Sequence, residues 1–162
     1  RAPWIMEKDD FKYSLSFGDD VFGGPRWCEL VGAEKAADYY EKGTVPVMLN
    51  ADGRPLTRNF VHVDDLVSAI AIAIGHPAAR QHLFNIAMNE PVDYRAVADY
   101  LGETRGLDSV EVPTQFHSTW LDNNKARQRL GWQPDYDLPR LIDAAWDYQR
   151  ADDDPRKIWY PG

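Results

Sequence analysis

The stretch Arg58-Asn59-Phe60-Val61-His62-Val63-Asp64-Asp65-Leu66 combines a lone cation, a short apolar segment and an acidic helix start. Its β-branched and aromatic residues favour an extended backbone. Asp64 is a good N-cap for a helix over the apolar residues 66–74. The stretch therefore predicts a loop, a strand and a helix, in that order, with His62 as a polar residue of the strand.

Arg58 is the candidate binding residue of this stretch. It follows the turn residues Asn50-Ala51-Asp52-Gly53, so we expect it at a surface loop beside a cleft, where a guanidinium can bind an anion. The alternative is an ion pair with Asp52, Asp64 or Asp65 that fixes the turn. Judged from these residues by themselves, the ion pair is the preferred interpretation.

Composition indicates one globular unit. The 162 residues are 44% hydrophobic and 27% charged, and a chain of this length buries roughly 70% of its unfolded surface. The net charge of -8 gives no long-range attraction to nucleic acid or to an anionic membrane. No apolar run approaches the roughly 18 residues of a membrane span. The single Cys28 excludes an intramolecular disulfide and fits a reducing compartment, so we predict a cytoplasmic protein.

The start of the chain predicts a preceding segment. Arg1-Ala2-Pro3-Trp4-Ile5 has no initiator Met and no secretion signal, and its bulky residues suit the end of a buried strand. Residues 1–26 are interpreted as this strand end and a long loop. The whole chain, residues 1–162, is then a single lobe that continues from a missing N-terminal lobe.

The remaining pattern alternates helices with short strands. Helices are predicted over residues 27–42, which end at Gly43, over 66–74, 93–106 and 122–130, and from 137 onward. Strands are predicted over 45–49, 83–87 and 110–112. Because residues 66–74 are apolar on nearly every face, we expect their helix to be buried until His76-Pro77 ends it. No metal site is predicted, since the histidines lack ligand spacing.

Three short motifs add a family resemblance. Residues 58–65 resemble an Arg-Asp-Phe-Val-His-Val-Asp-Asp segment, and Phe84-Asn85-Ile86-Ala87 resembles a Tyr-Asn-Ile-Gly strand. Asp122 through Lys125-Ala126, Leu130-Gly131-Trp132 and Pro134 resemble an Asp-Ser-Lys-Ala, Leu-Gly-Trp, Pro signature. In this order they resemble the C-terminal portion of an NAD-dependent epimerase/dehydratase of the extended short-chain dehydrogenase/reductase family.

The resemblance implies a fold and an activity. The fold would be a small mixed α/β substrate-binding lobe that lacks most of the Rossmann sheet. The parent enzyme would use NAD or NADP to act on a sugar or nucleotide-sugar substrate as an epimerase, a dehydratase or a reductase. The family's Tyr-x-x-x-Lys pair and Gly-rich turn are absent from this sequence, so the chain alone is expected to bind no cofactor and to be inactive, with no catalytic residue of its own.

The resemblance also assigns site residues. Pro3 would face the cofactor, whereas Trp4, Arg58 and Asp122 would face the substrate, with Arg58 on a phosphate. The family's second arginine is missing, because residues 112–120 contain neither Arg nor Lys. This departure counts against a pyrophosphate-linked substrate. Asp122 also has a purely structural interpretation as a helix N-cap.

Two alternative roles of the chain and its state of assembly remain open. The chain could be a non-catalytic binding or interaction module of a degenerate family member, or a lobe that complements a separate cofactor subunit. Its partners would be a small-molecule substrate and the missing cofactor lobe, with neither nucleic acid nor a membrane. Apolar residues meant for that lobe, including Pro3, Trp4 and the 66–74 helix, are expected to be buried against another copy when the chain is by itself, which makes a homo-oligomer a candidate assembly.

Overall fold

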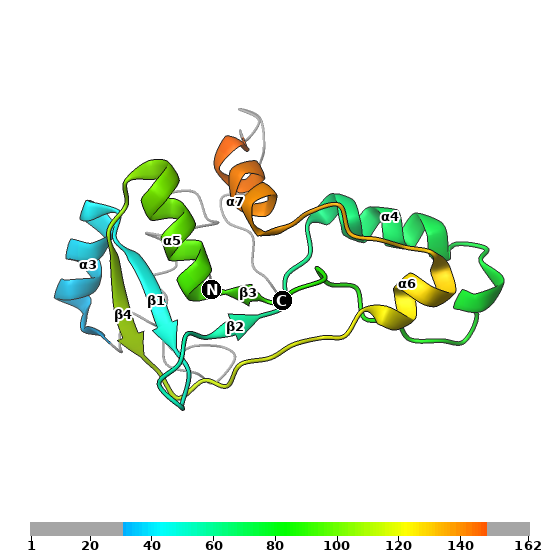
Figure 1. Cartoon of the computed structure of the whole chain (residues 1–162), viewed down its shortest axis with the longest axis horizontal. Coiled ribbons are helices and arrows are strands. Elements are labelled where there is room, and N and C mark those ends of the chain that lie inside the picture. The colour runs from blue at the N-terminus through cyan, green and yellow to red at the C-terminus, as the bar shows by residue number, and fades with distance from the viewer. Residues whose placement is uncertain (1–30, 149–162) are drawn as a thin grey trace.

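The structure is a computed structural model, and it describes residues 31–148 of the chain. The fold is small and mixed α/β (Figure 1). Its helices are α3 (Ala33–Lys42), α4 (Val63–Ala73), η2 (a 3-10 helix, Pro77–Ala79), α5 (Tyr94–Arg105), α6 (Asn124–Leu130) and α7 (Leu138–Asp147). Its strands are β1 (Val45–Leu49), β2 (Thr57–Arg58), β3 (Val92–Asp93) and β4 (Ser109–Pro113).

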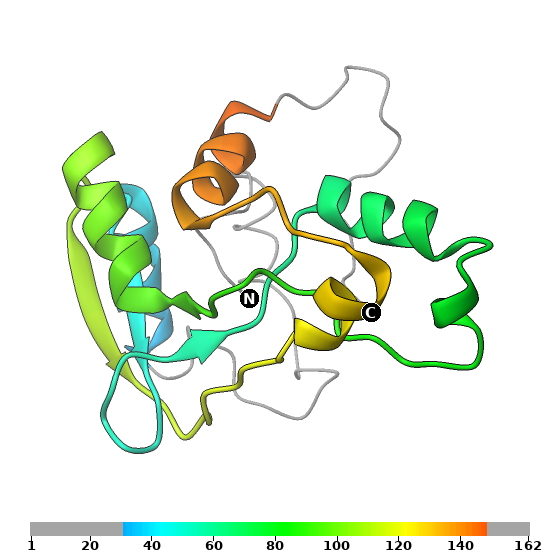
Figure 2. The same ribbon diagram turned by 45° about the vertical axis from the view of Figure 1, so that its right-hand side comes forward.

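The strands form two small sheets. β1 pairs in parallel with β4, from Val45 opposite Ser109 to Leu49 opposite Pro113. β2 pairs antiparallel with β3, with Thr57 opposite Asp93. α5 connects β3 to β4 and packs against β1. The α/β part thus occupies one end of the molecule, and α4, η2 and α6 occupy the other end (Figures 1 and 2).

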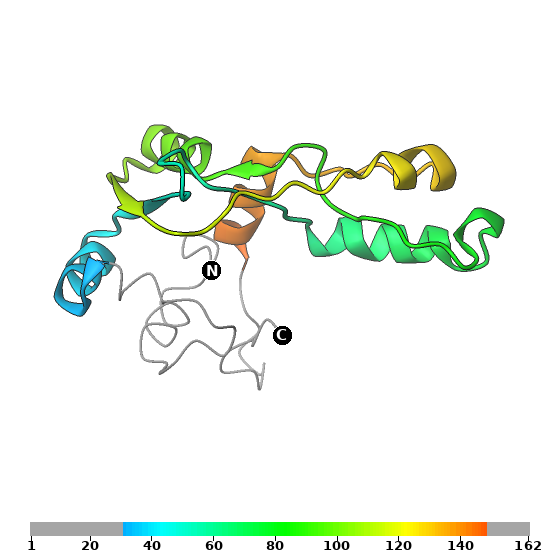
Figure 3. The same cartoon turned by 90° about the horizontal axis from the view of Figure 1, so that it is seen from below.

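Each end has its own hydrophobic core. The buried residues of the α/β end are Val45, Val47, Met48, Leu56, Met88, Val92, Tyr94, Val97, Ala98, Leu101, Leu141 and Ile142. The buried residues of the helical end are Ala69, Ala126, Leu130 and Trp132. Seen from below (Figure 3), α4 and α6 lie in separate layers of the helical end. The small size of the second core leaves much of α4 without a partner among the described residues.

Extended segments join the two ends. We call residues 59–62, 87–91 and 114–123 the connecting segments, and Figure 1 shows them crossing between the ends. Met88 N donates to Phe60 O at 2.8 Å. The buried Asn123 donates from Nδ2 to Ala87 O at 2.9 Å and to Asn89 Oδ1 at 3.1 Å. The segments are therefore held by scattered backbone bonds and asparagine side chains instead of a regular strand ladder.

Several helix ends confirm the sequence predictions. Asp93 caps α5 by accepting from Arg95 N, and Asp137 caps α7 by accepting from Arg140 N. Glycines with positive φ follow α3, α5 and α6, namely Gly43, Gly106 and Gly131. The helix predicted over 27–42 is confirmed only from Ala33 to Lys42, as α3, because Gly32 adopts a φ of 87° and interrupts it. Residues 27–30 lie outside the described residues.

The predictions for residues 60–66 are wrong in detail. The strand is Thr57–Arg58 and ends before Phe60. The N-cap of α4 is His62, whose Nδ1 accepts from Asp64 N at 3.2 Å, so His62 is not a strand residue and Asp64 lies in the first turn. The helix begins earlier because the imidazole supplies the acceptor that was expected of the carboxylate. It also ends earlier than His76-Pro77, at Ala73, and Gly75 follows with φ of 77°.

Two predictions of burial and pairing are also wrong for the described chain. Residues 83–87 form no strand, because no described segment pairs with their backbone. α4 is not buried on nearly every face. Its exposed apolar residues are Val63, Leu66, Val67, Ile70 and Ile72, and its C-cap Ile74 is exposed as well. Within residues 31–148, no helix combines the length and the apolar character that crossing a membrane requires.

Candidate functional site

Arg58 lies at the end of β2, half-buried, beside the segment that follows β4. Its Nη1 donates to His117 O, and its guanidinium carbon is 5.9 Å from the ring centroid of Phe116. Among the described residues, the ion pairs expected with Asp52, Asp64 or Asp65 do not form. Burial raises the pKa of the neighbouring Tyr94, and the Arg58 charge partly offsets this rise. Within residues 31–148, the guanidinium is therefore held by a carbonyl and a ring, and no carboxylate of these residues pairs with it.

Residues 118–121 are hydrogen-bonded to the residues on both sides of Arg58. Thr119 N donates to Thr57 O at 3.1 Å, and Thr57 N donates to Ser118 Oγ at 3.1 Å. Asn59 donates from Nδ2 to Thr119 Oγ1 at 3.1 Å and accepts from Leu121 N at 2.5 Å. Residues 57–59 and 118–121 consequently run alongside each other, and both neighbours of Arg58 are hydrogen-bonded to the second segment.

The segment that follows β4 and lies beside Arg58 carries no carboxylate. Residues 114–121 read Thr-Gln-Phe-His-Ser-Thr-Trp-Leu. A guanidinium has five N–H donors, and only one contact of Arg58, to His117 O, is a hydrogen bond to a described residue. Carboxylates and phosphates are the groups that a guanidinium binds most strongly, so the remaining donors, which no residue of 31–148 satisfies, have the chemistry to bind such a group.

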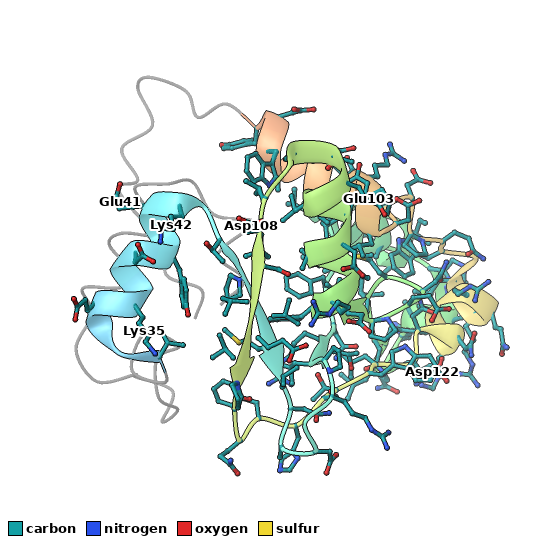
Figure 4. The ribbon with its side chains drawn as sticks, turned by 60° about the vertical axis from the view of Figure 1, so that its left-hand side comes forward. Lys35, Glu41, Lys42, Glu103, Asp108 and Asp122 are labelled. Carbon is teal, nitrogen blue, oxygen red and sulfur yellow. The ribbon has the colours of Figure 1, made fainter. Side chains whose placement is uncertain are left out.

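Asp122 lies at the start of α6, as labelled in Figure 4. Its Oδ1 accepts from Asn124 N at 2.8 Å, and its carbonyl accepts from Asn85 Nδ2 at 3.0 Å. The assigned N-cap is Asn123, but Asn123 makes no side-chain capping bond. The side chain of Asp122 thus caps the start of α6, as the sequence predicts, from the position directly before Asn123. Its exposed carboxylate keeps a substrate role as a prediction.

Pro3 and Trp4 lie outside the described residues, so their predicted roles stay predictions. Within residues 31–148, no cluster of His, Cys, Asp or Glu side chains could hold a metal ion.

A second polar cluster was missed in the sequence. His62 stacks on Tyr136 with ring centroids 3.6 Å apart, Tyr136 donates its hydroxyl to Asp64 Oδ2 at 3.1 Å, and Arg140 lies 4.4 Å from the Tyr136 ring centroid. The spacing of Tyr136 and Arg140, four residues apart, was the available signal. Loss of hydration and the bond to Asp64 raise the pKa of Tyr136. A tyrosine that removes protons needs a lowered pKa, so this cluster does not replace the missing Tyr-x-x-x-Lys pair.

Asp65 is a buried carboxylate with a structural task. Its Oδ1 accepts from Asp135 N at 2.8 Å and its Oδ2 accepts from Tyr136 N at 3.2 Å. Trp132 Nε1 donates to Asp65 O at 3.2 Å and to Ser68 Oγ at 3.0 Å. Two of the quoted motifs, one around residue 65 and one around residue 132, therefore meet in the core of the helical end.

Solved structures share the described fold. A crystal structure of a short-chain dehydrogenase/reductase superfamily protein from Agrobacterium tumefaciens with bound NAD has a TM-score of 0.60 and 24% identity, covering 73% of this chain and 38% of that chain. UDP-glucuronic acid 4-epimerase from Bacillus cereus in complex with UDP-glucuronic acid and NAD has a TM-score of 0.53 and 22% identity, covering 77% and 41%. The described fold is thus part of a short-chain dehydrogenase/reductase fold.

Sequence relatives agree with the fold. UDP-glucose 4-epimerase of Rhizobium leguminosarum bv. trifolii is 30% identical over 104 residues, covering 56% of this chain and 30% of that protein. UDP-D-apiose/UDP-D-xylose synthase 1 of Arabidopsis thaliana is 28% identical over 118 residues, covering 60% and 30%. No protein-family model matches the chain. In sequence and fold, the chain matches the C-terminal portion of an NAD-dependent epimerase/dehydratase of the extended short-chain dehydrogenase/reductase family, and it spans about three tenths of the length of these curated relatives.

Proposed function

We propose that the chain is the substrate-binding part of an NAD- or NADP-dependent epimerase, dehydratase or reductase that acts on a sugar or nucleotide sugar. The observation that carries the proposal is Arg58, which projects beside a carboxylate-free segment with no counter-charge among the described residues. In the family that the chain resembles, the arginine at this position contacts a phosphate of the substrate. Arg58 would orient the anionic group of the substrate here.

The chain would bind substrate and leave the chemistry to another part of the protein. Its sequence has no tyrosine with a lysine four residues later and no pair of glycines spaced two apart. These residues therefore do not fit a dinucleotide, and the NAD of a family-length protein would be held by the part that this sequence lacks. We expect the isolated chain to be inactive, with Pro3 next to the cofactor and with Trp4 and Asp122 lining the substrate site in the complete protein.

A titration of the complete protein tests the role of Arg58. We expect Arg58→Ala to weaken the binding of UDP by at least about tenfold, which corresponds to about 1.4 kcal/mol, because a charge-assisted bidentate contact is lost. The matched control is Arg54→Ala, which removes the same charge from the exposed turn before β2. Isothermal titration that gives Arg58→Ala the affinity of the unmodified protein would remove Arg58 from the site.

The alternative is a non-catalytic binding module. It is favoured by the lack of the catalytic tyrosine-lysine pair and of the Gly-rich turn in this sequence. The coding sequence upstream of Arg1 decides between the two. A Gly-x-x-Gly-x-x-Gly turn and a Tyr-x-x-x-Lys pair upstream would support the enzyme, whereas a start codon directly before Arg1 would support the module. A separately encoded cofactor subunit is a third arrangement, which co-purification would detect.

Self-association is part of the same proposal. Val63, Val67 and Ile70 lie along one side of α4 and are 62%, 58% and 52% exposed. Apolar side chains at this spacing form one continuous helix face, and such a face is normally covered in a soluble protein. In the isolated chain a second copy would cover it, and in a family-length protein the missing lobe would.

A further inference from the structure

The helical end carries a concentration of positive charge. Segments 66–89 and 123–134, which supply the core of this end, contain none of the 26 Asp and Glu residues of the chain. Surfaces of soluble proteins normally mix charges of both signs. These segments contain four of the 18 Lys and Arg residues, namely Arg80, Lys125, Arg127 and Arg129. In a chain with a net charge of -8, the helical end is therefore positive while the remainder is acidic.

Lys125 and Arg129 form a like-charged pair on α6. Both are exposed and they are four residues apart, so they lie on the same face of the helix, one turn from each other. Like charges at this spacing repel and disfavour the helix. Neither residue forms an ion pair with a carboxylate of residues 31–148. The pair thus lacks an anionic partner within the described part of the chain.

Two aromatic rings contact this pair. Lys125 Nζ lies 5.1 Å from the centroid of the Phe84 ring, and Arg129 Nη1 lies 3.3 Å from His82 Nε2. The His82 and Phe84 rings are themselves in edge-to-face contact, with centroids 6.4 Å apart. The four side chains therefore form one connected cluster, in which the rings define the positions of both cations.

The polar groups of the cluster are donors. Ammonium and guanidinium groups only donate, so His82 Nε2 accepts from Arg129. The imidazole proton then lies on His82 Nδ1, which adds a donor to those of the two cations. A phosphate monoester is complementary to such a group of donors, because it has three acceptor oxygens and a charge of about -1.5 to -2 near neutral pH.

We propose that Lys125 and Arg129, with His82 as an additional donor, form a binding site for a phosphate-type dianion. Residues one helical turn apart have Cβ atoms about 5–6 Å apart, so one tetrahedral oxyanion spans both cations and relieves their repulsion. A single carboxylate neutralises only one of the two charges. The site is separate from Arg58, since β2 lies away from α6 and η2 in Figures 1 and 2, and it does not depend on the proposed function.

Three anions test the site: inorganic phosphate, methyl phosphate and acetate, each titrated into the complete protein at constant ionic strength. The readout is the NMR shift of the backbone amides of residues 82–85 and 124–130. We expect both phosphates to give saturable shifts there, and acetate to bind at least about tenfold more weakly, because its charge matches only one cation. Binding of both phosphates assigns the site to phosphate esters as well as to the free ion, whereas binding of inorganic phosphate alone assigns it to the free ion.

Substitutions on α6 identify the cations that bind. Lys125→Gln and Arg129→Gln should each weaken phosphate binding at least about fivefold, and Lys125→Arg should retain most of the affinity. The matched control is Arg127→Gln, which removes the same charge from the same helix. The Arg127 guanidinium contacts Gln133 Oε1 at 3.1 Å and Asn124 Oδ1 at 3.5 Å, outside the cluster. Its loss should change the affinity by less than about twofold.

The same titration in Arg58→Ala separates this site from the substrate site. We expect the phosphate-dependent shifts of residues 82–85 and 124–130 to persist in this variant, and their disappearance would overturn the proposal. Equal weakening by Lys125→Gln and Arg127→Gln would overturn it too, because it would indicate a diffuse positive surface without a defined site. An acetate affinity equal to that of phosphate would refute the preference for a dianion.

Discussion

The Asp65 carboxylate ties the start of α4 to the chain that follows α6, and its removal tests how the helical end is held. Asp65 is 3% exposed and accepts from the backbone N–H groups of Asp135 and Tyr136. A hydrogen bond to a charged group contributes about 1.5–3 kcal/mol. Because Asp135 is exposed and water can replace part of its bond, we take the lower end for each. Asp65→Ala should therefore lower the free energy of unfolding by about 3 kcal/mol.

Urea unfolding followed by tryptophan fluorescence measures this change, since Trp132 donates to the Asp65 carbonyl and lies in the same core. Asp65→Asn keeps one acceptor oxygen and should cost roughly half as much. The matched control is Asp64→Ala, because the Asp64 side chain is 72% exposed and should contribute less than about 1 kcal/mol. An Asp65→Ala variant within about 0.5 kcal/mol of the unmodified protein would refute this account of the helical end.

Two further predictions concern charge and association. The hydrogen bond from Arg105, reinforced by that from Tyr100, holds the pKa of Asp143 below its usual range. The Asp143 carboxylate therefore stabilises the fold fully above the unfolded pKa of about 3.9. This stabilisation is lost as the pH falls through the lower pKa of the folded state. Asp143→Asn should lower unfolding free energy at pH 7, and urea titrations should find this difference shrinking below about pH 4; a pH-independent difference would contradict the ion pair. Val67→Lys places a charge on the exposed face of α4 and should abolish the concentration-dependent association that sedimentation velocity detects. The control Glu103→Lys, at an exposed position of α5, should leave the association unchanged. An unmodified protein that stays monomeric at every concentration would exclude the self-association.

Helices with local signals were predictable from the sequence. α5 and α7 begin after Asp93 and Asp137, whose side chains accept from backbone N–H groups within the first turn. The strand Val45–Leu49 and the turn at Gly53, with φ of 74°, were also correct. These features depend on a few adjacent residues, and the chemistry of those residues is sufficient to specify them.

Features that depend on distant residues were not predictable in the same way. The strand over residues 83–87 needs a partner, and none of the described segments supplies one. The helix over 66–74 was expected to be buried, but its exposed face lacks a neighbour in residues 31–148. Both errors concern features that depend on contacts between distant residues, which a local sequence pattern does not specify.

The candidate site shows the same division. Arg58 was identified from its motif, but its contact with His117 joins residues far apart in the chain and has no sequence signal. Asp122 was placed correctly at the start of α6, since a capping carboxylate is a local feature.

The cores of the two ends alternate along the polypeptide. The core residues of the α/β end come from residues 45–56, 88–101 and 141–142, whereas those of the helical end come from 69 and 126–132. The chain therefore leaves the α/β end and returns to it twice before the core of that end is complete. A protease nick in the exposed turn around Gln81 and His82 should accordingly yield two fragments that stay bound to each other and elute together, because neither fragment contains a whole core.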